Sequence, residues 1–177
     1  DSPPIQPGDV VVVSGGARGV TAEAVHAIAK AWRPRIVILG RSAEPASEPN
    51  WLSGLTSEAE IKQALIARAP ASTLPKAIQQ QCQQILAARE VTHHLTLLRE
   101  QGVTATYHSV DIRDAIAVKE ILGQIERTVG KVKAVVHGAG VLADQKIEDK
   151  TWEQFDRVYG TKVRGLHSIL NSIAARY

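Results

Sequence analysis

The chain has 177 residues, of which 44% are hydrophobic and 22% charged, so it can bury a core and is not of the disordered class. The net charge is only +3 and the basic residues are scattered, which argues against a nucleic-acid partner. One cysteine excludes a disulfide scaffold, and the histidines show no ligand spacing, so we predict no metal. Apolar runs of at most four or five residues exclude a transmembrane helix and a membrane partner.

The chain contains no methionine and opens on a proline-rich stretch, Asp1-Ser2-Pro3-Pro4. No secretory hydrophobic segment follows it. We therefore expect a piece of a longer, cytoplasmic polypeptide rather than an exported protein. Residues 1–8 are interpreted as the end of a linker and residues 9–177 as one domain.

Short apolar runs alternate with amphipathic helices, which is typical of stacked βαβ units. We expect strands at 10–13, 35–39, 104–110 and 132–136, with a helix over 18–32 after the first strand. The helix after the third strand has one apolar face and ends at Gly130; this face comprises Val118, Ile121, Leu122, Ile125 and Val129. The predicted fold class is α/β, a doubly wound parallel sheet of the Rossmann type.

A last long helix is expected from about Thr151, and the sequence stops at Tyr177 where another parallel strand would come next. The four strands amount to little more than half of a doubly wound sheet, so a truncated sheet is expected. Its unpaired edge makes a homodimer plausible. The inner face of this helix is predicted to carry Trp152, Phe155, Tyr159, Leu166, Leu170 and Ile173.

The connection between the second and third strands runs from residue 40 to residue 103, far longer than an ordinary connection. It carries its own helix signals. Ser57 and Glu60 form a capping box for a short helix to about residue 69, and Pro75 suits the first residue of a long helix that Gly102 closes. Residues 43–88 are interpreted as a mostly helical insertion.

A glycine-rich turn follows the first strand and reads Ser14-Gly15-Gly16-Ala17-Arg18-Gly19-Val20-Thr21. Glycines at a strand-to-helix turn let the backbone approach a pyrophosphate, so we predict cofactor binding by Gly15, Gly16, Ala17, Arg18, Gly19 and Val20. Gly15 and Gly19 stand four apart, as in short-chain dehydrogenases, whose third glycine is replaced by Thr21. The alternative is an ordinary glycine turn of a βα connection.

Gly40-Arg41-Ser42 ends the second strand, where an NAD site would place a carboxylate. Arg41 and Ser42 suit a 2′-phosphate and favour NADPH, the alternative being a surface arginine. Asp111, with Ile112 beside it, follows the third strand and is placed to bind adenine, unless the aspartate is only a turn or helix cap. Small residues close the fourth strand and would let the ribose and nicotinamide lie on the backbone: Gly138, Ala139 and Gly140.

These motifs occur in the order seen in modular synthases, together with Lys162-Val163-x-Gly165. The chain resembles the ketoreductase (β-ketoacyl reductase) domain of type I polyketide synthases, and its long insertion resembles the polyunsaturated fatty acid synthase branch. The resemblance implies NADPH-dependent reduction of 3-ketoacyl thioesters carried on an acyl carrier protein, beside neighbouring synthase domains.

The resemblance also implies a catalytic Ser, Tyr, Lys and Asn. Lys162 matches the lysine, whose ammonium would lower the pKa of the tyrosine and contact the nicotinamide ribose. The other three would lie beyond Tyr177, so we expect this chain alone to be inactive. Tyr159 is one residue too close to Lys162 for a Tyr-x-x-x-Lys pair and is predicted to be a core residue.

Leu142-Ala143-Asp144 resembles the Leu-Asp-Asp of reductases that give the R-configured product, with the first aspartate lost. Leu142 and Asp144 are therefore predicted to orient the substrate, unless Asp144 only caps a loop. Two other hypotheses remain: a non-catalytic nucleotide-binding or structural module of a synthase, and a stand-alone short-chain dehydrogenase acting on small alcohols. Measurable NADPH affinity would argue against a purely structural module.

Overall fold

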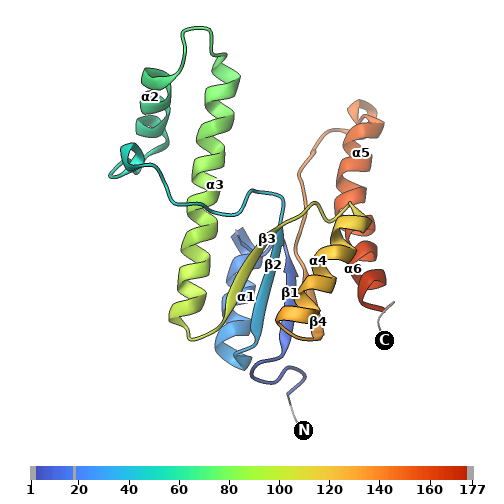
Figure 1. The fold of residues 1–177 in the computed structure, drawn as a ribbon. Helices are drawn as coiled ribbons and strands as arrows, with labels where there is room; N and C mark the ends of the chain where they lie inside the picture. Colours follow the sequence, from blue (N-terminus) through green and yellow to red (C-terminus); the bar gives the residue numbers. More distant parts are fainter. Residues whose placement is uncertain (1–2, 18, 175–177) are drawn as a thin grey trace.

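A computed structural model describes residues 3–17 and 19–174. Its centre is a parallel sheet of β1 (Val10–Ser14), β2 (Arg35–Gly40), β3 (Ala105–Ser109) and β4 (Val132–His137), in the order β3-β2-β1-β4 (Figure 1). Branched aliphatic residues fill β1 and β2, as expected for strands covered on both faces. The predicted α/β class and parallel order of strands are confirmed.

Helices cover the two faces of the sheet and produce two separate cores. Val11 and Val13 point to the face that α1 (Gly19–Trp32) and α3 (Pro75–Glu100) cover. Val10 and Val12 point to the opposite face, beneath α4 (Ala115–Thr128) and α6 (Gly165–Ala174). This alternation is the two-residue period of a strand, and it places two helices in each outer layer.

The helical insertion between β2 and β3 is confirmed and stands away from the sheet (Figure 1). It comprises η1 (Asn50–Leu52), α2 (Glu58–Arg68) and the first half of α3. The predicted capping box at the start of α2 and the proline at the start of α3 are present. The insertion has its own small core of Leu52, Ile61, Leu65, Ile78 and Cys82.

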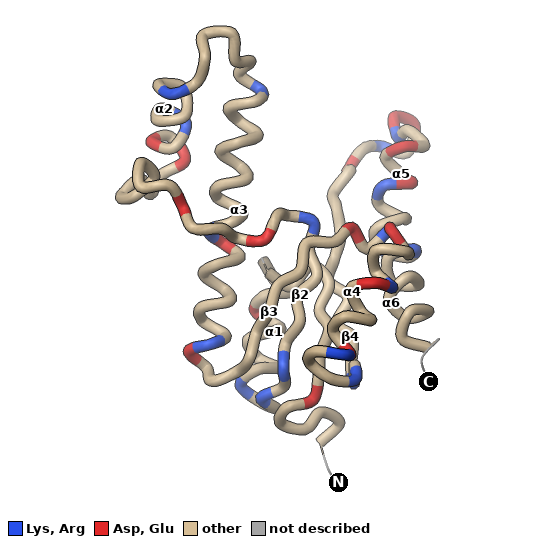
Figure 2. The backbone as a smooth tube through the Cα atoms, viewed as in Figure 1, with Lys and Arg blue, Asp and Glu red and all other residues tan. Residues whose placement is uncertain are grey.

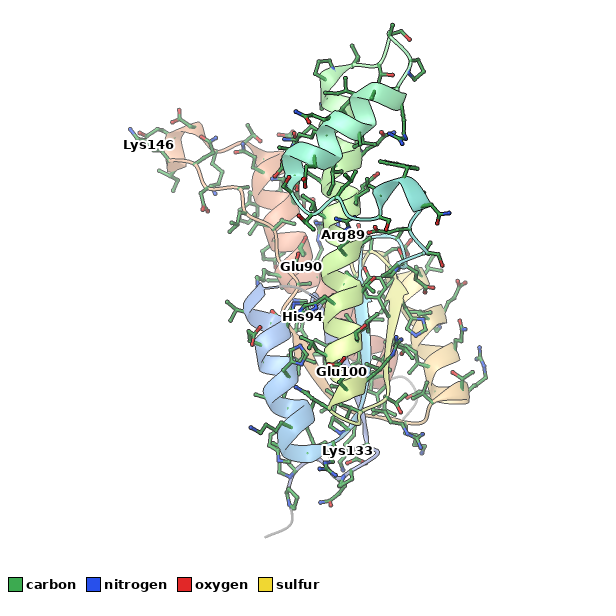
Figure 3. The ribbon with its side chains drawn as sticks, turned by 90° about the vertical axis from the view of Figure 1, so that its left-hand side faces the viewer. Arg89, Glu90, His94, Glu100, Lys133 and Lys146 are labelled. Carbon is green, nitrogen blue, oxygen red and sulfur yellow. The ribbon has the colours of Figure 1, made fainter. Side chains whose placement is uncertain are left out.

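Helix α3 does not end with the insertion but continues as one rod to Glu100, so its second half packs on the sheet through Val91, Leu95 and Leu98. Arg89, labelled in Figure 3, lies in the middle of α3 and holds the segment that precedes α2. Its guanidinium donates to both carboxylate oxygens of Glu48, at 2.6 and 2.8 Å, and to the carbonyls of Leu52 and Leu55. These hydrogen bonds from Arg89 lower the pKa of Glu48.

The last helical segment differs from the expectation. It consists of α5 (Trp152–Tyr159), a π-helical turn η3 (Gly160–Arg164) and α6. Trp152, Phe155 and Tyr159 are 73%, 43% and 44% exposed and stack on one another, so the predicted inner face and the predicted core position of Tyr159 are wrong. Leu170 is also exposed, whereas Ile173 packs against the core as predicted.

Close packing explains which side of this helix is buried. A Cβ atom on Gly165 would lie 2.5 Å from Cδ1 of Ile112, so the helix approaches the core too closely for a large side chain there. Its buried face therefore consists mainly of small residues: Gly160, Thr161, Gly165, Ser168 and Ser172, with Ile169. The apolar spacing marks a stripe along the helix, but the small residues determine the side that faces the sheet.

Charged side chains are distributed over many elements, as Figure 2 shows, and do not gather on one helix or strand. Among the described residues, none of the helices combines the length and the apolar character that crossing a membrane requires.

Candidate nucleotide-binding site

A cavity of about 310 Å³ opens at the carboxyl ends of the strands, beside the turn that follows β1. This is the edge at which open α/β sheets bind ligands. Most of the residues predicted to bind a cofactor line it: Gly15, Ala17, Arg41, Ser42, Ile112, Gly138, Ala139 and Gly140. The sequence motifs after β1, β2 and β4, and the residues after β3, therefore meet at one site.

The turn after β1 requires glycine at position 15. Gly15 has a φ of +72°, and a Cβ atom there would lie 2.7 Å from Cα of Ala139. Backbone hydrogen bonds hold this close approach, from Gly15 N to Leu39 O (2.8 Å) and from Gly138 N to Ser14 O (2.9 Å). Because Gly15 has no side chain, the backbone of the turn is uncovered beside the cavity, a shape that suits a pyrophosphate.

Three described residues of the predicted turn, Gly16, Gly19 and Val20, are not among those that line the cavity. Gly16 is buried against Val13 beneath the turn, whereas Gly19 and Val20 start α1 and are exposed. Arg18 lies outside the described residues. Their predicted contacts with a cofactor stay predictions.

Arg41 and Ser42 lie where β2 ends, between the parts of the cavity wall that follow β1 and β3. The Tyr107 hydroxyl on β3 donates a 2.9 Å hydrogen bond to the carbonyl of Ser42 and so fixes the backbone of this pair. Within residues 3–17 and 19–174, Arg41 makes no hydrogen bond or ion pair. Its guanidinium is therefore available to an anion.

Asp111 has a partner of its own. The Arg113 side chain donates to both of its carboxylate oxygens, and the Arg113 backbone N–H donates to one of them. These hydrogen bonds lower the pKa of Asp111, with smaller contributions from the charges of Arg113 and Arg41. Asp111 is not among the residues that line the cavity, whereas the buried side chain of Ile112 is.

Lys162 is not among the residues that line the cavity, but its side chain lies beside Gly140, which does line it. A Cβ atom on Gly140 would be 2.8 Å from Cε of Lys162 and 3.1 Å from Nζ, so the lysine side chain crosses the open backbone of that glycine. The preceding residue, Thr161, lines the cavity. Lys162 belongs to η3, and π-helical turns are frequent at functional sites.

A chain of two hydrogen bonds ties this turn to the sheet. His137 Nε2 lies 3.0 Å from the carbonyl oxygen of Lys162, and Nδ1 lies 2.7 Å from the Ser14 hydroxyl. Because a carbonyl only accepts, Nε2 carries the proton and Nδ1 accepts from Ser14. Burial lowers the pKa of His137, which favours this neutral form.

Leu142 and Asp144 lie on the exposed segment that follows β4. Two side chains hold its backbone: Arg157 donates to the carbonyl of Leu142 and Lys150 to that of Ala143, both at 3.1 Å. Neither Leu142 nor Asp144 is among the residues that line the cavity, and their substrate role stays a prediction.

Sequence reasoning missed several residues of the site. Val91 reaches the cavity from α3 and Tyr107 from β3, and neither carries a local motif. Thr21 also lines the cavity, although the sequence marked it only as a departure from the glycine pattern. His137 and Ser14 could have been noticed as polar residues that end apolar strands.

Comparison with known proteins identifies the family, since the model of the KR domain matches residues 9–176. The chain belongs to the KR domain family. It is 37% identical over 175 residues to a polyunsaturated fatty acid synthase subunit from a Thraustochytrium species; the match covers 93% of this chain and 6% of that synthase subunit. The KR domain described here thus spans a small part of its curated relative.

Solved structures share the fold of this KR domain. An N-terminal ketoreductase from the macrolactin assembly line gives a TM-score of 0.67 at 21% identity, over 96% of this chain and 26% of that one. A short chain dehydrogenase from Mycobacterium paratuberculosis bound to NAD gives 0.64 at 19% identity, over 96% and 51%. These likenesses show the short-chain dehydrogenase fold, as the sequence resemblance implied.

The residues of this KR domain fit a nicotinamide dinucleotide. Glycine at positions 15 and 140 lets the Ala139 backbone and the Lys162 side chain approach closely beside the cavity, where no side chain of these two glycines covers the backbone. Arg41 supplies a cation at the cavity wall, and Lys162 supplies one beside Gly140. A dinucleotide that carries phosphate groups matches this distribution of positive charge.

Proposed function

We propose that this KR domain takes part in the NADPH-dependent reduction of 3-ketoacyl thioesters to 3-hydroxyacyl thioesters. The observation that carries the proposal is Arg41, a cation at the cavity wall that makes no hydrogen bond or ion pair among the described residues. A guanidinium binds a phosphate in a bidentate manner, and NADPH differs from NADH by a 2′-phosphate. Ser42, held by Tyr107, would add a hydrogen bond beside it.

The chain's own residues would bind and orient the cofactor. The glycine turn at Gly15 would receive the pyrophosphate, and the backbone at Gly138 and Gly140 would receive the ribose and nicotinamide. Bound NADPH would supply the hydride that attacks the 3-keto carbon. Lys162 would contact the nicotinamide ribose and, by its charge, lower the pKa of a tyrosine that protonates the developing alkoxide.

Ser14 and His137 would support this chemistry from the sheet, because they fix the backbone of the turn that carries Lys162. The three remaining catalytic residues that the resemblance implies would come from a continuation of the chain. We therefore propose that residues 9–177 act as the first part of a ketoreductase domain within a larger synthase, and that this part alone is inactive.

Three finer features belong to the same proposal. The substrate would be carried by an acyl carrier protein, as the synthase relative suggests. Leu142 and Asp144 would favour the R-configured product. The enzyme would work in the cytoplasm, as part of polyketide or fatty acid biosynthesis, and this chain by itself would pair with a second copy through the open edge of its sheet.

The test uses this chain extended through its native continuation. NADPH and NADH oxidation are followed with a 3-ketoacyl thioester and the product's configuration is determined. We expect turnover with NADPH, its loss in Lys162→Ala, and a large increase of the KM for NADPH in Arg41→Ala. A folded protein that binds NADPH without turnover would instead indicate a non-catalytic nucleotide-binding module.

A further inference from the structure

Thr21 and Gly138 touch across the floor of the cavity, one from the first turn of α1 and the other from the end of β4. A Cβ atom on Gly138 would lie 2.8 Å from Cβ of Thr21, and closer still to Cγ2 and Oγ1. Real Cβ atoms essentially never come within 3.0 Å of a non-bonded atom. The two positions therefore share the space of one side chain.

Rotation of the threonine cannot remove this conflict. Turning about χ1 moves Cγ2 and Oγ1 but leaves Cβ of Thr21 where it is, and that atom is itself too close. A β-branched residue in a helix is also restricted at χ1. Only glycine at 138 is compatible with a side chain at 21. The glycine at 138 thus compensates for the threonine that replaces the third glycine of the turn.

The Thr21 hydroxyl is available to donate a hydrogen bond at the cavity. Within the part of the chain that the structure describes, it makes no hydrogen bond, and the residue lines the cavity between Gly15 and Gly138. Other threonines in these helices, Thr92 and Thr161, donate to the carbonyl four residues earlier. The Thr21 hydroxyl is not used in that way.

We propose that Thr21 is a ligand of the dinucleotide, donating its hydroxyl to a pyrophosphate oxygen, and that Gly138 is the matched residue that makes room for it. This inference rests on the proposed function for the identity of the ligand. Arg41 acts at the 2′-phosphate, so the two residues have separable effects: Thr21 acts on NADPH and NADH alike, and Arg41 on NADPH alone.

The packing part is tested by urea unfolding of the parent chain, the single variants Thr21→Gly and Gly138→Ala, and Gly138→Ala combined with Thr21→Gly or with Thr21→Ala. Gly138→Ala should raise the unfolding equilibrium constant at least about tenfold, the ordinary effect of overpacking a tight site. Thr21→Gly in the same chain should recover most of that loss, whereas Thr21→Ala should recover less because its Cβ remains. The matched pair would be overturned if Thr21→Gly and Thr21→Ala recovered equal stability in the Gly138→Ala chain. Additive effects of Thr21→Gly and Gly138→Ala on the free energy of unfolding would overturn it as well.

The ligand part is tested by fluorescence titration of the chain with NADPH. Thr21→Val keeps the branched shape and removes the hydroxyl, and should weaken NADPH binding about tenfold, as loss of a hydrogen bond to a charged group does. Thr21→Ser keeps the hydroxyl and should stay within about threefold of the parent. Thr21→Val should weaken the binding of NADH by the same factor.

The outcomes separate this inference from the proposed function. If the parent chain binds NADPH and Thr21→Val binds it equally well, the ligand role of Thr21 is overturned while the proposed function stands. If the folded parent binds neither NADPH nor NADH, the proposed function and the ligand role fall together. The urea experiment needs no cofactor, so it decides the matched pair in either case.

Discussion

Replacing Gly15 by alanine should damage the turn after β1 more than its positive φ alone explains. Gly102, at the end of α3, is the matched control: its φ is +78° against +72°, but nothing lies within 4 Å of its would-be Cβ. Gly102→Ala therefore carries only the cost of a left-handed alanine, about 1–2 kcal/mol. Gly15→Ala carries that cost and a clash with the Ala139 backbone, which is 2.7 Å away.

Overpacking of this kind adds about 1–3 kcal/mol, so Gly15→Ala should cost about 2–5 kcal/mol in all. At about 2–4 °C per kcal/mol for a chain of this length, the thermal midpoint should fall by about 4–20 °C, against about 2–8 °C for Gly102→Ala. Thermal unfolding followed by circular dichroism measures both. NADPH titration should show binding lost only in Gly15→Ala. Equal midpoints with unchanged NADPH binding would refute the close approach to Ala139.

Three further predictions concern the cation, the histidines and the insertion. Arg41→Ala should weaken NADPH binding about tenfold to a hundredfold and leave NADH binding unchanged, measured by titration; an equal loss for both would remove Arg41 from the 2′-phosphate. Burial is the main cause that lowers the pKa of His94 and of His137, so the unfolded chain binds more protons, and the free energy of unfolding should fall as the pH drops below about 6.5. Urea unfolding at pH 7.5 and 5 checks this, and a rise toward pH 5 contradicts it. Arg89→Lys cannot reproduce the paired hydrogen bonds to Glu48 and those to the carbonyls of Leu52 and Leu55, so hydrogen exchange should speed up in residues 48–69 and remain unchanged in β1. An equal change of the exchange rates in both regions would argue against a separate insertion core.

The two central strands, β1 and β2, could be predicted from sequence because each is a short branched-aliphatic run between turn signals. Val10 to Val13 and Ile36 to Leu39 need no distant information to be recognised. The capping residues Ser57 and Glu60 likewise act within one turn. Local physics therefore determined these elements, and the boundaries differ by only a residue or two from the expectation.

The side of the last helix that is buried could not be predicted in this way. Trp152, Phe155 and Tyr159 have helical spacing and seemed to mark the inner face, but the spacing is the same for an exposed stripe. The deciding contact joins Gly165 to Ile112, more than fifty residues apart. Size complementarity between distant segments, rather than hydrophobicity, selects the buried side.

The residues of the site also divide into those that a local sequence signal marks and those that depend on contacts between distant segments. The glycines after β1 and Arg41 after β2 have signals at their own positions, and the topology brings them to one edge. The contact of Thr21 with Gly138 and the hydrogen bond from Tyr107 to Ser42 join residues far apart in sequence. The ion pair of Asp111 with Arg113 is different, because only Ile112 separates the partners in sequence and their opposite charges could have been weighed.

The most direct test of the account compares NADPH with NADH oxidation by this chain, extended through its native continuation, in the presence of a 3-ketoacyl thioester. The account predicts turnover with NADPH, a strong preference over NADH that Arg41→Ala abolishes, and no turnover in Lys162→Ala although NADPH still binds. Equal rates with both cofactors, or full activity in Lys162→Ala, would contradict it.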